Sequence, residues 1–380
     1  MQITKQQLTG DQATALEAIH GWAHDPQGPS EFFLSGYAGT GKTTLLKMLD
    51  LQDHTLYLAP TGKACQALKI RGVEAQTIHS LIYIPRASTD EAGVTTLEFQ
   101  AKDESLVGTF LVVDEASMVS EDMATDLAKT GARILWVGDS GQLPPIGGDP
   151  SVLNGPNGVC LNQIVRQAFG SSIIEFSQAI RTSDNVRATI RQLRGTSDGT
   201  DVAILAKVPP KRIAEIARKY QMDQIICGFN IDRNAINRAE RKFRRYVEPV
   251  CVGERLICTL NNFEMGVVNG EMFDVVELSE GAVKDCVTAV LTGGEAGDHR
   301  TVQLHIPTLC GESMHTWKRK TLSGRGVLFA DYGYAVTCHK SQGSEWPSVL
   351  VVDSPCSLWE HSRWLYTAIT RAKQKVIVLS

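Results

Sequence analysis

Seven strongly apolar runs recur along this 380-residue chain, and segments of helical character separate them. The runs are continuously hydrophobic rather than alternating, which is typical of strands buried on both faces of a parallel sheet. Four runs precede residue 150 and three follow residue 220, so the pattern predicts an α/β fold with two lobes. The seven runs cover residues 31–35, 55–60, 109–115, 133–139, 224–229, 348–353 and 375–380.

Two segments interrupt this rhythm. Residues 83–108 are polar around a Gly-Val-Thr-Thr sequence and predict a short hairpin-like insertion in the first lobe. Residues 251–325 alternate apolar and polar positions between turn residues, which predicts a small antiparallel β-barrel inserted in the second lobe. The predicted division is therefore a first lobe at 1–150 and a second lobe at 151–250 and 326–380.

A basic segment at residues 233–245 is predicted to form a helix. Helical spacing would give it an apolar face made of Ala235, Ile236, Ala239 and Phe243. Its arginines and lysine are then expected to form a solvated basic face, with contact to nucleic acid as the less favoured interpretation.

Composition narrows the class of protein. Hydrophobic residues at 43% and charged residues at 21% are typical of a globular protein. The net charge of −4 argues against a broadly basic surface, but a locally positive channel could still bind a nucleic acid strand. Nine scattered cysteines without a CxxC pair argue against a zinc ribbon or a disulfide framework. No run approaches the roughly 18 to 20 apolar residues of a membrane span, so a soluble intracellular protein is expected.

Residues 36–43 (GYAGTGKT) fit the phosphate-binding pattern GxxxxGK[ST] between a predicted strand and a predicted helix. Glycines let backbone N–H groups turn toward phosphate oxygens, and the helix N-terminus adds partial positive charge. Lys42 is expected to pair with the β- and γ-phosphates of ATP, and Thr43 to offer its hydroxyl to Mg²⁺. The predicted nucleotide contacts in this loop are Gly36, Ala38, Gly39, Thr40, Gly41, Lys42, Thr43 and Thr44.

Two acids, Asp114 and Glu115, end the apolar run at 109–115. The carboxyl ends of parallel strands are where open α/β sheets bind ligands. Asp114 is predicted to join Thr43 in the magnesium shell, and Glu115 to polarise the water that attacks the γ-phosphate. Taken alone, such a pair would more often cap the next helix.

Nine segments occur in an order that resembles superfamily 1 helicases of the RecD-like and Dda-like branch. The resemblance implies two RecA-like lobes with an SH3-like barrel in the second, and an ATP- and Mg²⁺-dependent motor that moves 5′ to 3′ on single-stranded DNA. It also implies a phage or bacterial source, and hence the cytoplasm of a bacterium or of a phage-infected host cell. The segments are residues 8–12, 36–44, 58–64, 76–81, 112–118, 137–146, 164–167, 333–346 and 365–373.

The resemblance assigns further nucleotide contacts. Arg166 and Arg371 would reach in from the second lobe to stabilise charge on the γ-phosphate, although isolated arginines are more often surface ion-pair partners. Gln142 would sense the γ-phosphate, and Gln12 would read the adenine edge. Glu345, with Gly343 in the same segment, would hold the ribose.

The resemblance also assigns contacts to the DNA strand in each lobe. Their hydroxyl, imidazole and ammonium groups suit contact to sugar and phosphate rather than to base edges. Taken singly, the two histidines would be core or capping residues. The predicted contacts are Pro60, Thr61, Lys63, Thr77 and His79 in the first lobe, and Thr337, His339 and Lys340 in the second.

Three functions remain open from the sequence. The favoured one is an ATP-dependent DNA helicase, a monomeric motor that acts on single strands and duplex junctions, with the insertion at 83–108 as the strand-separating wedge. It would work with replication or recombination proteins in replication, recombination or repair. The alternatives are an RNA helicase or translocase, and an ATP-switched single-strand-binding protein that does not unwind. A small-molecule kinase fits poorly, because it would leave residues 333–346 and 365–373 without a task.

Overall fold

A computed structural model describes most of the chain, and the described residues fall in two compact units. Unit 1 comprises Met1–Ile84, Ala101–Thr189 and Cys356–Thr370, and unit 2 comprises Pro85–Gln100, Ile190–Pro355 and Arg371–Ser380. The described residues are 8–49, 51, 54–89, 95–145, 155–165, 172–194, 201–262, 265–293 and 299–380.

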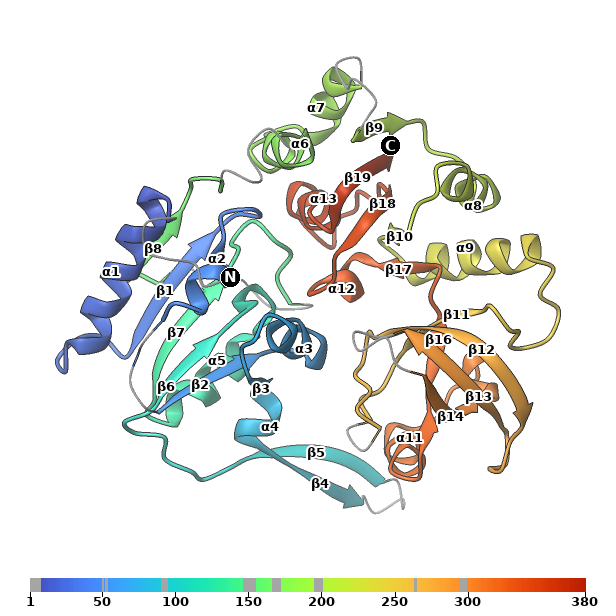
Figure 1. Ribbon diagram of the computed structural model, residues 1–380, viewed down its shortest axis with the longest axis horizontal. Helices are drawn as coiled ribbons and strands as arrows, with labels where there is room; N and C mark the ends of the chain where they lie inside the picture. The colour runs from blue at the N-terminus through green and yellow to red at the C-terminus, as the bar shows by residue number, and fades with distance from the viewer. Residues whose placement is uncertain are drawn as a thin grey trace. The chain divides into compact units, whose positions relative to one another are not determined.

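Unit 1 is built on a six-stranded sheet of order β3-β2-β6-β7-β1-β8 (Figure 1). All of its neighbouring strands pair in parallel. The four apolar runs predicted before residue 150 are strands here, whereas the short β3 and β8 were not predicted. The strands are β1 (Glu31–Gly36), β2 (Thr55–Ala59), β3 (Ala75–Thr77), β6 (Phe110–Val113), β7 (Arg133–Gly138) and β8 (Gly158–Leu161).

Helices cover both faces of this sheet. On one face α1 (Gly10–His24), α2 (Lys42–Leu46) and α3 (Gly62–Ile70) pack into an apolar cluster with the strands. On the other face α4 (Ile78–Ile82) and α5 (Glu121–Lys129) do the same. All four residues of β6 are buried, as a strand covered on both faces requires. The remaining helices near this unit are η2 (Ala116–Met118), α6 (Ser172–Arg181), α7 (Val186–Leu193) and α13 (His361–Ile369).

Unit 2 contains a second parallel sheet, of order β17-β10-β18-β19-β9. Helices α8 (Pro210–Lys219) and α9 (Asn230–Phe243) share an apolar core with this sheet. A single turn, α12 (Cys338–Ser341), follows β17. The three runs predicted after residue 220 are strands here. The strands are β9 (Val202–Leu205), β10 (Gln224–Cys227), β17 (Ala335–Thr337), β18 (Trp346–Val352) and β19 (Ala372–Leu379).

A third sheet, of order β15-β14-β13-β12-β11-β16, also lies in unit 2. Its pairs are antiparallel except for β14 with β15. The two edge strands are joined by a single residue, Phe329, although the edges of a flat six-stranded sheet would lie ~24 Å apart. The sheet therefore curls until its edges meet, and its assignment as an SH3-like barrel stays a prediction. Its strands are β11 (Arg255–Cys258), β12 (Met272–Glu280), β13 (Cys286–Gly293), β14 (Arg300–His305), β15 (Val327–Leu328) and β16 (Ala330–Tyr332), accompanied by α10 (Ile306–Leu309) and α11 (Thr316–Ser323).

The segment predicted as a hairpin contains β4 (Tyr83–Thr89) and β5 (Thr95–Ala101), which pair as a two-stranded sheet. Among the described residues, no helix is long and apolar enough to cross a bilayer.

The boundaries differ from the predicted division in four places. Residues Pro85–Gln100, within the hairpin predicted for the first lobe, group with unit 2. Strand β8 pairs with β1, so the first sheet extends past residue 150. The third sheet extends past residue 325, to Tyr332. Residues Cys356–Thr370 group with unit 1 rather than with the second sheet. A partly exposed strand such as β8 has no continuous apolar run, and grouping by contact follows the folded path of the chain rather than its order.

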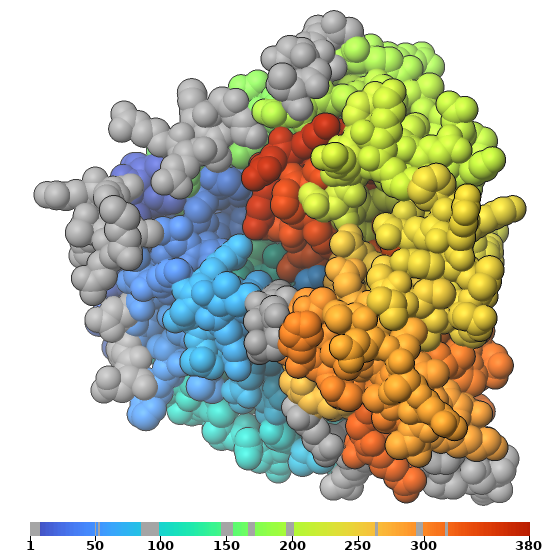
Figure 2. Space-filling model, turned by 45° about the vertical axis from the view of Figure 1, so that its right-hand side comes forward, coloured from blue at the N-terminus to red at the C-terminus, as the bar shows by residue number. Residues whose placement is uncertain are grey.

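The predicted apolar face of α9 is partly wrong. The helix buries Arg233, Ile236, Asn237 and Glu240, whereas Phe243 is 60% exposed. The polar members of this face have partners: Arg233 pairs with Asp331 at 2.7 Å, for example. Figure 2 shows α9, in yellow, beside the orange residues of the third sheet. Charge pairing therefore replaces apolar packing along this helix.

The close approach of β8 to β1 gives a stability prediction. A Cβ atom on Gly158 would lie 2.5 Å from the carbonyl oxygen of Phe33, and backbone cannot move aside cheaply. We expect Gly158→Ala to lower the free energy of unfolding by about 1–3 kcal/mol. Gly21→Ala is the matched control, because nothing lies within 4 Å of its new methyl in α1, and a gain of about 0.5–1 kcal/mol is expected. Thermal denaturation of both variants measures this, and an unchanged Tm for Gly158→Ala would contradict the close packing.

Candidate functional site

Three neighbouring strands of unit 1 end at one edge of the first sheet. β6, β7 and β1 are adjacent and parallel, so the residues that follow them share that edge. Asp114 follows β6, Asp139 follows β7, and the loop at 37–41 follows β1. The sheet therefore brings the predicted phosphate loop and the predicted carboxylates together.

The phosphate loop is a tight turn between β1 and α2. Gly39 and Gly41 have φ angles of 80° and 79°, which side chains disfavour, so the glycine pattern has a steric reason. Lys42 Nζ donates to the carbonyl oxygens of Gly36 at 2.6 Å and Tyr37 at 3.1 Å. The ammonium group thus lies inside the loop, where the sequence predicts phosphate binding.

Gln12 packs between α1 and this loop. Its Nε2 donates to the carbonyl of Thr40 at 2.9 Å, and its Oε1 accepts from the amide of Thr9 at 3.1 Å as part of a capping box on α1. The side chain is buried, and a Cβ on Gly41 would lie 2.4 Å from its Nε2. The structure therefore gives Gln12 a role in packing α1 against the loop, and its contact with adenine stays a prediction.

Asp114 carries its charge in a half-buried position, directly after a strand that is fully buried. Burial raises the pKa of its carboxyl to about 6, and the nearby Glu115 charge adds to the rise, while Lys42 and Arg71 oppose it. Asp114 Oδ1 accepts from the amide of Glu115 at 2.9 Å. A buried anion that lacks sufficient neutralising charge is suited to receive a cation.

Glu115 has a left-handed backbone with a φ of 53°, a conformation that costs roughly 1–3 kcal/mol for a residue with a side chain. It precedes η2 but makes no capping bond with its side chain. The capping interpretation of this acid therefore does not hold. Strain of this kind concentrates at functional sites, in keeping with the predicted role of Glu115 in activating water.

The residues present fit Mg²⁺. Thr43 and Asp114 offer hydroxyl and carboxylate oxygens, the donors that this ion prefers. Arg71 Nη1 donates to the Thr43 hydroxyl at 3.1 Å, so a guanidinium supplies positive charge to this place. The sequence analysis missed Arg71, because it lies after α3 and outside every recognised segment.

Gln142 lies in the loop after β7, and its side chain is buried. Its Oε1 is a buried oxygen without a hydrogen-bond partner. Its backbone is fixed, because its amide donates to the carbonyl of Asp139 at 3.1 Å. An unsatisfied buried acceptor costs roughly 1–3 kcal/mol, which a bound water or ligand would recover.

In unit 2 the predicted nucleotide contacts meet at the amino ends of β18 and β19. Glu345 precedes β18 and Arg371 precedes β19, and the amide of Trp346 donates to the carbonyl of Arg371 at 2.9 Å. Arg371 Nη1 also donates to the carbonyl of Ser344 at 3.4 Å. Glu345 pairs with Lys373 at 3.1 Å. Gly343, in the same turn, has a φ of 73°.

The predicted strand contacts of unit 1 lie after β2 and β3. Ala59 pairs with Thr77, so Pro60, Thr61 and Thr77 share the edge that carries the phosphate loop. Thr61 caps α3 by accepting from the amide of Ala64 at 3.2 Å, and Thr77 caps α4 in the same way. Lys63 lies in the first turn of α3, and the ring of His79 lies 5.3 Å from that of Tyr83.

In unit 2 the predicted strand contacts Thr337, His339 and Lys340 follow β17. Burial lowers the pKa of His339 and of Lys340. Lys340 lies 3.6 Å from the Asp331 carboxylate, which partly offsets the effect of burial. Thr337 pairs with Cys227 at the carboxyl end of the second sheet, whereas Arg371 lies at the amino end.

Arg166, the other predicted arginine, lies outside the described residues. The structure adds residues that the sequence analysis did not select. The Arg181 guanidinium lies 3.4 Å from the centre of the Tyr37 ring, beside the phosphate loop, and Tyr366 donates to Asp139. Tyr366 lies within the recognised segment at 365–373, but only Arg371 was selected there.

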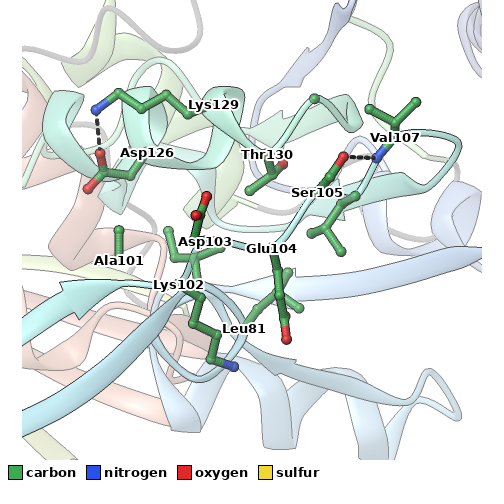
Figure 3. A pocket seen from close by; sticks show the side chains of 13 residues that line it. Leu81, Ala101, Lys102, Asp103, Glu104, Ser105, Val107, Asp126, Lys129 and Thr130 are labelled. Atoms are coloured by element: carbon green, nitrogen blue, oxygen red, sulfur yellow. Dashed lines mark hydrogen bonds and ion pairs between the residues drawn. The ribbon is translucent and has the colours of Figure 1, made fainter.

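A cavity of about 440 Å³ lies elsewhere in unit 1, where β5 leaves the first lobe (Figure 3). Asp126 and Lys129 of α5 form an ion pair at 2.9 Å on one side of it. None of the predicted site residues lines this cavity, so it is separate from the nucleotide site. It is lined by Leu81, Ile82, Ala101, Lys102, Asp103, Glu104, Ser105, Leu106, Val107, Asp126, Lys129, Thr130 and Gly131.

Comparison with known proteins decides the family. A family described as AAA domain matches residues 7–198, half of the chain, and the UvrD-like helicase C-terminal domain matches residues 332–379. The chain belongs to the AAA domain family. It is similar to superfamily 1 helicases of the RecD type: it is 26% identical to the ATP-dependent RecD2 DNA helicase of Deinococcus radiodurans, over 97% of its own length and 48% of that protein. It is also 26% identical to the RecD subunit of the Mycobacterium tuberculosis RecBCD enzyme, over 91% of its length and 66% of that subunit.

Solved Pif1 structures share the fold of this chain. A structure of two coordinating Pif1 helicases at forked double-stranded DNA has a TM-score of 0.62 at 19% identity, covering 98% of this chain and 92% of that one. Pif1 from Bacteroides in complex with ADP-AlF3 and single-stranded DNA gives 0.61 at 19% identity, covering 100% and 93%. The two parallel sheets are thus a RecA-like core. The chain spans about half the length of its Deinococcus relative.

The raised pKa of Asp114 predicts how stability depends on pH. The folded state holds the proton more tightly than an unfolded carboxyl with a pKa of 3.8, so the cost to stability grows as pH rises from that value and is complete above about pH 6. Without nucleotide, Asp114→Asn should therefore unfold at a higher Tm than the wild type near about pH 8, and this gap should shrink near about pH 5. The free-energy gap is on the order of 1.4 kcal/mol for each unit of pKa shift.

Asp126→Asn is the control of opposite sign, because hydrogen bonds from Lys129 and Tyr83 lower the pKa of that carboxyl. Its stabilising effect is lost only below the usual aspartate range, so Asp126→Asn should be less stable than the wild type by a constant amount between about pH 5 and about pH 8. A gap between Asp114→Asn and wild type that does not change with pH would contradict the burial of the Asp114 charge.

Proposed function

We propose that this chain is an ATP-driven helicase that moves along single-stranded DNA and separates duplex DNA. The observation that carries the proposal is the edge of the first sheet. There a phosphate loop, a half-buried carboxylate and a buried amide oxygen without a hydrogen-bond partner share one edge, in a chain whose residues 332–379 match a UvrD-like helicase C-terminal domain. The named activity of the Deinococcus relative and the DNA-bound Pif1 structures support the same function.

Hydrolysis is assigned to residues of the first sheet. The amides of the loop and Lys42 bind the phosphates, and Glu115 orients the attacking water through its carboxylate. The unpaired Oε1 of Gln142 accepts a hydrogen bond from that water, while its amide NH₂ is a donor for the γ-phosphate. Thr43 and Asp114 would hold Mg²⁺, which neutralises phosphate charge when bound. Gln12 would contact the base from its place behind the loop.

Arginines from the second lobe complete the chemistry in this proposal. Arg371 and Arg166 supply positive charge to the γ-phosphate, and Glu345 and Gly343 contact the ribose. Guanidinium groups act at this step because charge spreads over the γ-oxygens in the transition state. Turnover then requires both lobes, so binding and release of nucleotide change their spacing.

The strands of the second sheet are stiff and can transmit a displacement from one end of the sheet to the other. Residue 346 begins β18, and Thr337 lies level with its far end, so Arg371 and Thr337 are separated by roughly 20 Å along rigid strands. A shift at the nucleotide edge therefore moves the strand-contact edge as one body. The proposed DNA contacts of the first lobe are Pro60, Thr61, Lys63, Thr77 and His79. Those of the second lobe are Thr337, His339 and Lys340.

The accessory parts are assigned by the resemblance to superfamily 1 helicases. The curled third sheet is the SH3-like barrel, and β4 with β5 is the wedge that parts the strands. We place the lobes at 1–150 and at 151–250 with 326–380, with β8 added to the first lobe and the third sheet extended to Tyr332. The proposed movement along DNA is 5′ to 3′. The proposed setting is the cytoplasm, in DNA replication, recombination or repair. RNA is the alternative substrate, because the proposed strand-contact residues suit the sugar-phosphate backbone, which both nucleic acids have.

Unwinding and hydrolysis test the proposal together. The wild type should hydrolyse ATP faster when single-stranded DNA is added, and should separate a duplex with a 5′ tail but not one with a 3′ tail. Lys42→Ala should lose both activities, because the loop loses its phosphate-binding ammonium, while its circular dichroism stays that of the wild type. The same unwinding assay with tailed RNA duplexes tests the alternative, an RNA helicase. Strand-stimulated hydrolysis that persists in Lys42→Ala would refute the site.

Arg371 gives a separate prediction. Arg371→Ala should keep ATP binding, measured by fluorescence of a labelled nucleotide, and lose turnover by about 10³-fold or more. Arg363→Ala is the matched control, since Arg363 forms a surface ion pair with Glu360 at 2.9 Å and should leave turnover unchanged. Weakened binding with normal turnover at saturating ATP would contradict the assigned role.

A further inference from the structure

Tyr366 joins two loops of the nucleotide site through a single buried hydroxyl. The side chain lies on α13 and is fully buried. Its hydroxyl donates to Asp139 Oδ2 at 2.7 Å and accepts from the amide of Ala38, in the phosphate loop, at 2.9 Å. Burial raises the pKa of this hydroxyl, and the Asp139 charge adds to the rise, so it stays protonated and able to donate.

The bridge continues into the loop that carries Gln142. Asp139 Oδ1 accepts from the amide of Gly141 at 2.9 Å, and the Asp139 carbonyl accepts from the amide of Gln142 at 3.1 Å. On the far side, the hydroxyl of Thr367, next to Tyr366 on α13, accepts from the amide of Leu143 at 2.9 Å. Gln142 is therefore held from both sides by groups that depend on α13.

We infer that Tyr366 is a positioning residue that sets the Gln142 loop relative to the phosphate loop. The inference rests on the proposed function, and it adds a residue to which no role was assigned. Gln142 has an unpaired buried oxygen, so its placement is set by its backbone rather than by side-chain bonds. The bridge from Ala38 through Tyr366 to Asp139 fixes that backbone relative to the phosphate loop. Because α13 leads within two residues to Arg371, the same helix also links this loop to the arginine.

Tyr366→Phe tests the inference, because it removes the hydroxyl and keeps the ring. We expect kcat for DNA-stimulated ATP hydrolysis to fall about tenfold, equivalent to ~1.4 kcal/mol, while KM for ATP stays within about twofold. Hydrogen exchange followed by mass spectrometry should show faster exchange in peptides spanning 139–143, because the bonds of Asp139 loosen.

Tyr334→Phe is a closely matched control. The Tyr334 hydroxyl also bridges a carboxylate and a backbone amide, donating to Glu254 at 2.9 Å and accepting from Arg255 at 3.3 Å, but it lies in unit 2 beside the third sheet. Its loss should lower Tm by an amount comparable to that in Tyr366→Phe, because each change leaves a buried carboxylate with one bond fewer. It should leave kcat, and exchange at 139–143, as in the wild type.

The outcomes are separable. Unchanged exchange at 139–143 in Tyr366→Phe overturns the inference whether or not the protein hydrolyses ATP. Normal kcat, or a loss that Tyr334→Phe shares, overturns it as well, since the hydroxyl would then serve stability alone. A wild type without DNA-stimulated hydrolysis overturns the proposed function, while the exchange experiment still decides whether Tyr366 positions the loop.

Discussion

The common direction of the strands is the constraint on which the site depends. Parallel strands end at one edge, and in the first sheet the adjacent β6, β7 and β1 deliver Asp114, Asp139 and the phosphate loop to that edge. Such a sheet must be covered on both faces, which the helices of the two apolar clusters achieve. The same burial that stabilises the fold removes water from around Asp114, and so raises the pKa of its carboxyl.

Buried charges are treated differently in the two units. In unit 2 they are paired: Arg233 lies 2.7 Å from Asp331, and Arg241 lies 3.1 Å from Glu254. These pairs hold α9 against the third sheet, which is a structural task. At the nucleotide site, by contrast, Asp114 has a raised pKa and Gln142 has an unpaired oxygen. Unsatisfied polar groups cost stability, and in the proposed site a bound cation would neutralise the carboxylate and a water would donate to the amide oxygen.

The two sheets use their edges in different ways. In the first sheet the phosphate loop and the threonines that cap α3 and α4 lie at carboxyl ends of strands, so the proposed nucleotide and DNA contacts share one edge. In the second sheet Arg371 and Thr337 lie at opposite ends of the strands. A parallel sheet is stiff along its strands, so it can carry a displacement from one end to the other. This difference is consistent with one lobe that holds substrate and another that moves.

The sequence by itself determined the elements whose cause is local. Continuous apolar runs predicted seven strands, and the glycine pattern predicted the loop at Gly39 and Gly41, because burial on both faces and positive φ angles each leave a mark on adjacent residues. Only the tertiary structure decided the short strands β3, β8, β9 and β17, the polar buried face of α9, and the bond between Tyr366 and Asp139. Those two residues are 227 positions apart, and their meeting depends on the path of the whole chain rather than on any local pattern.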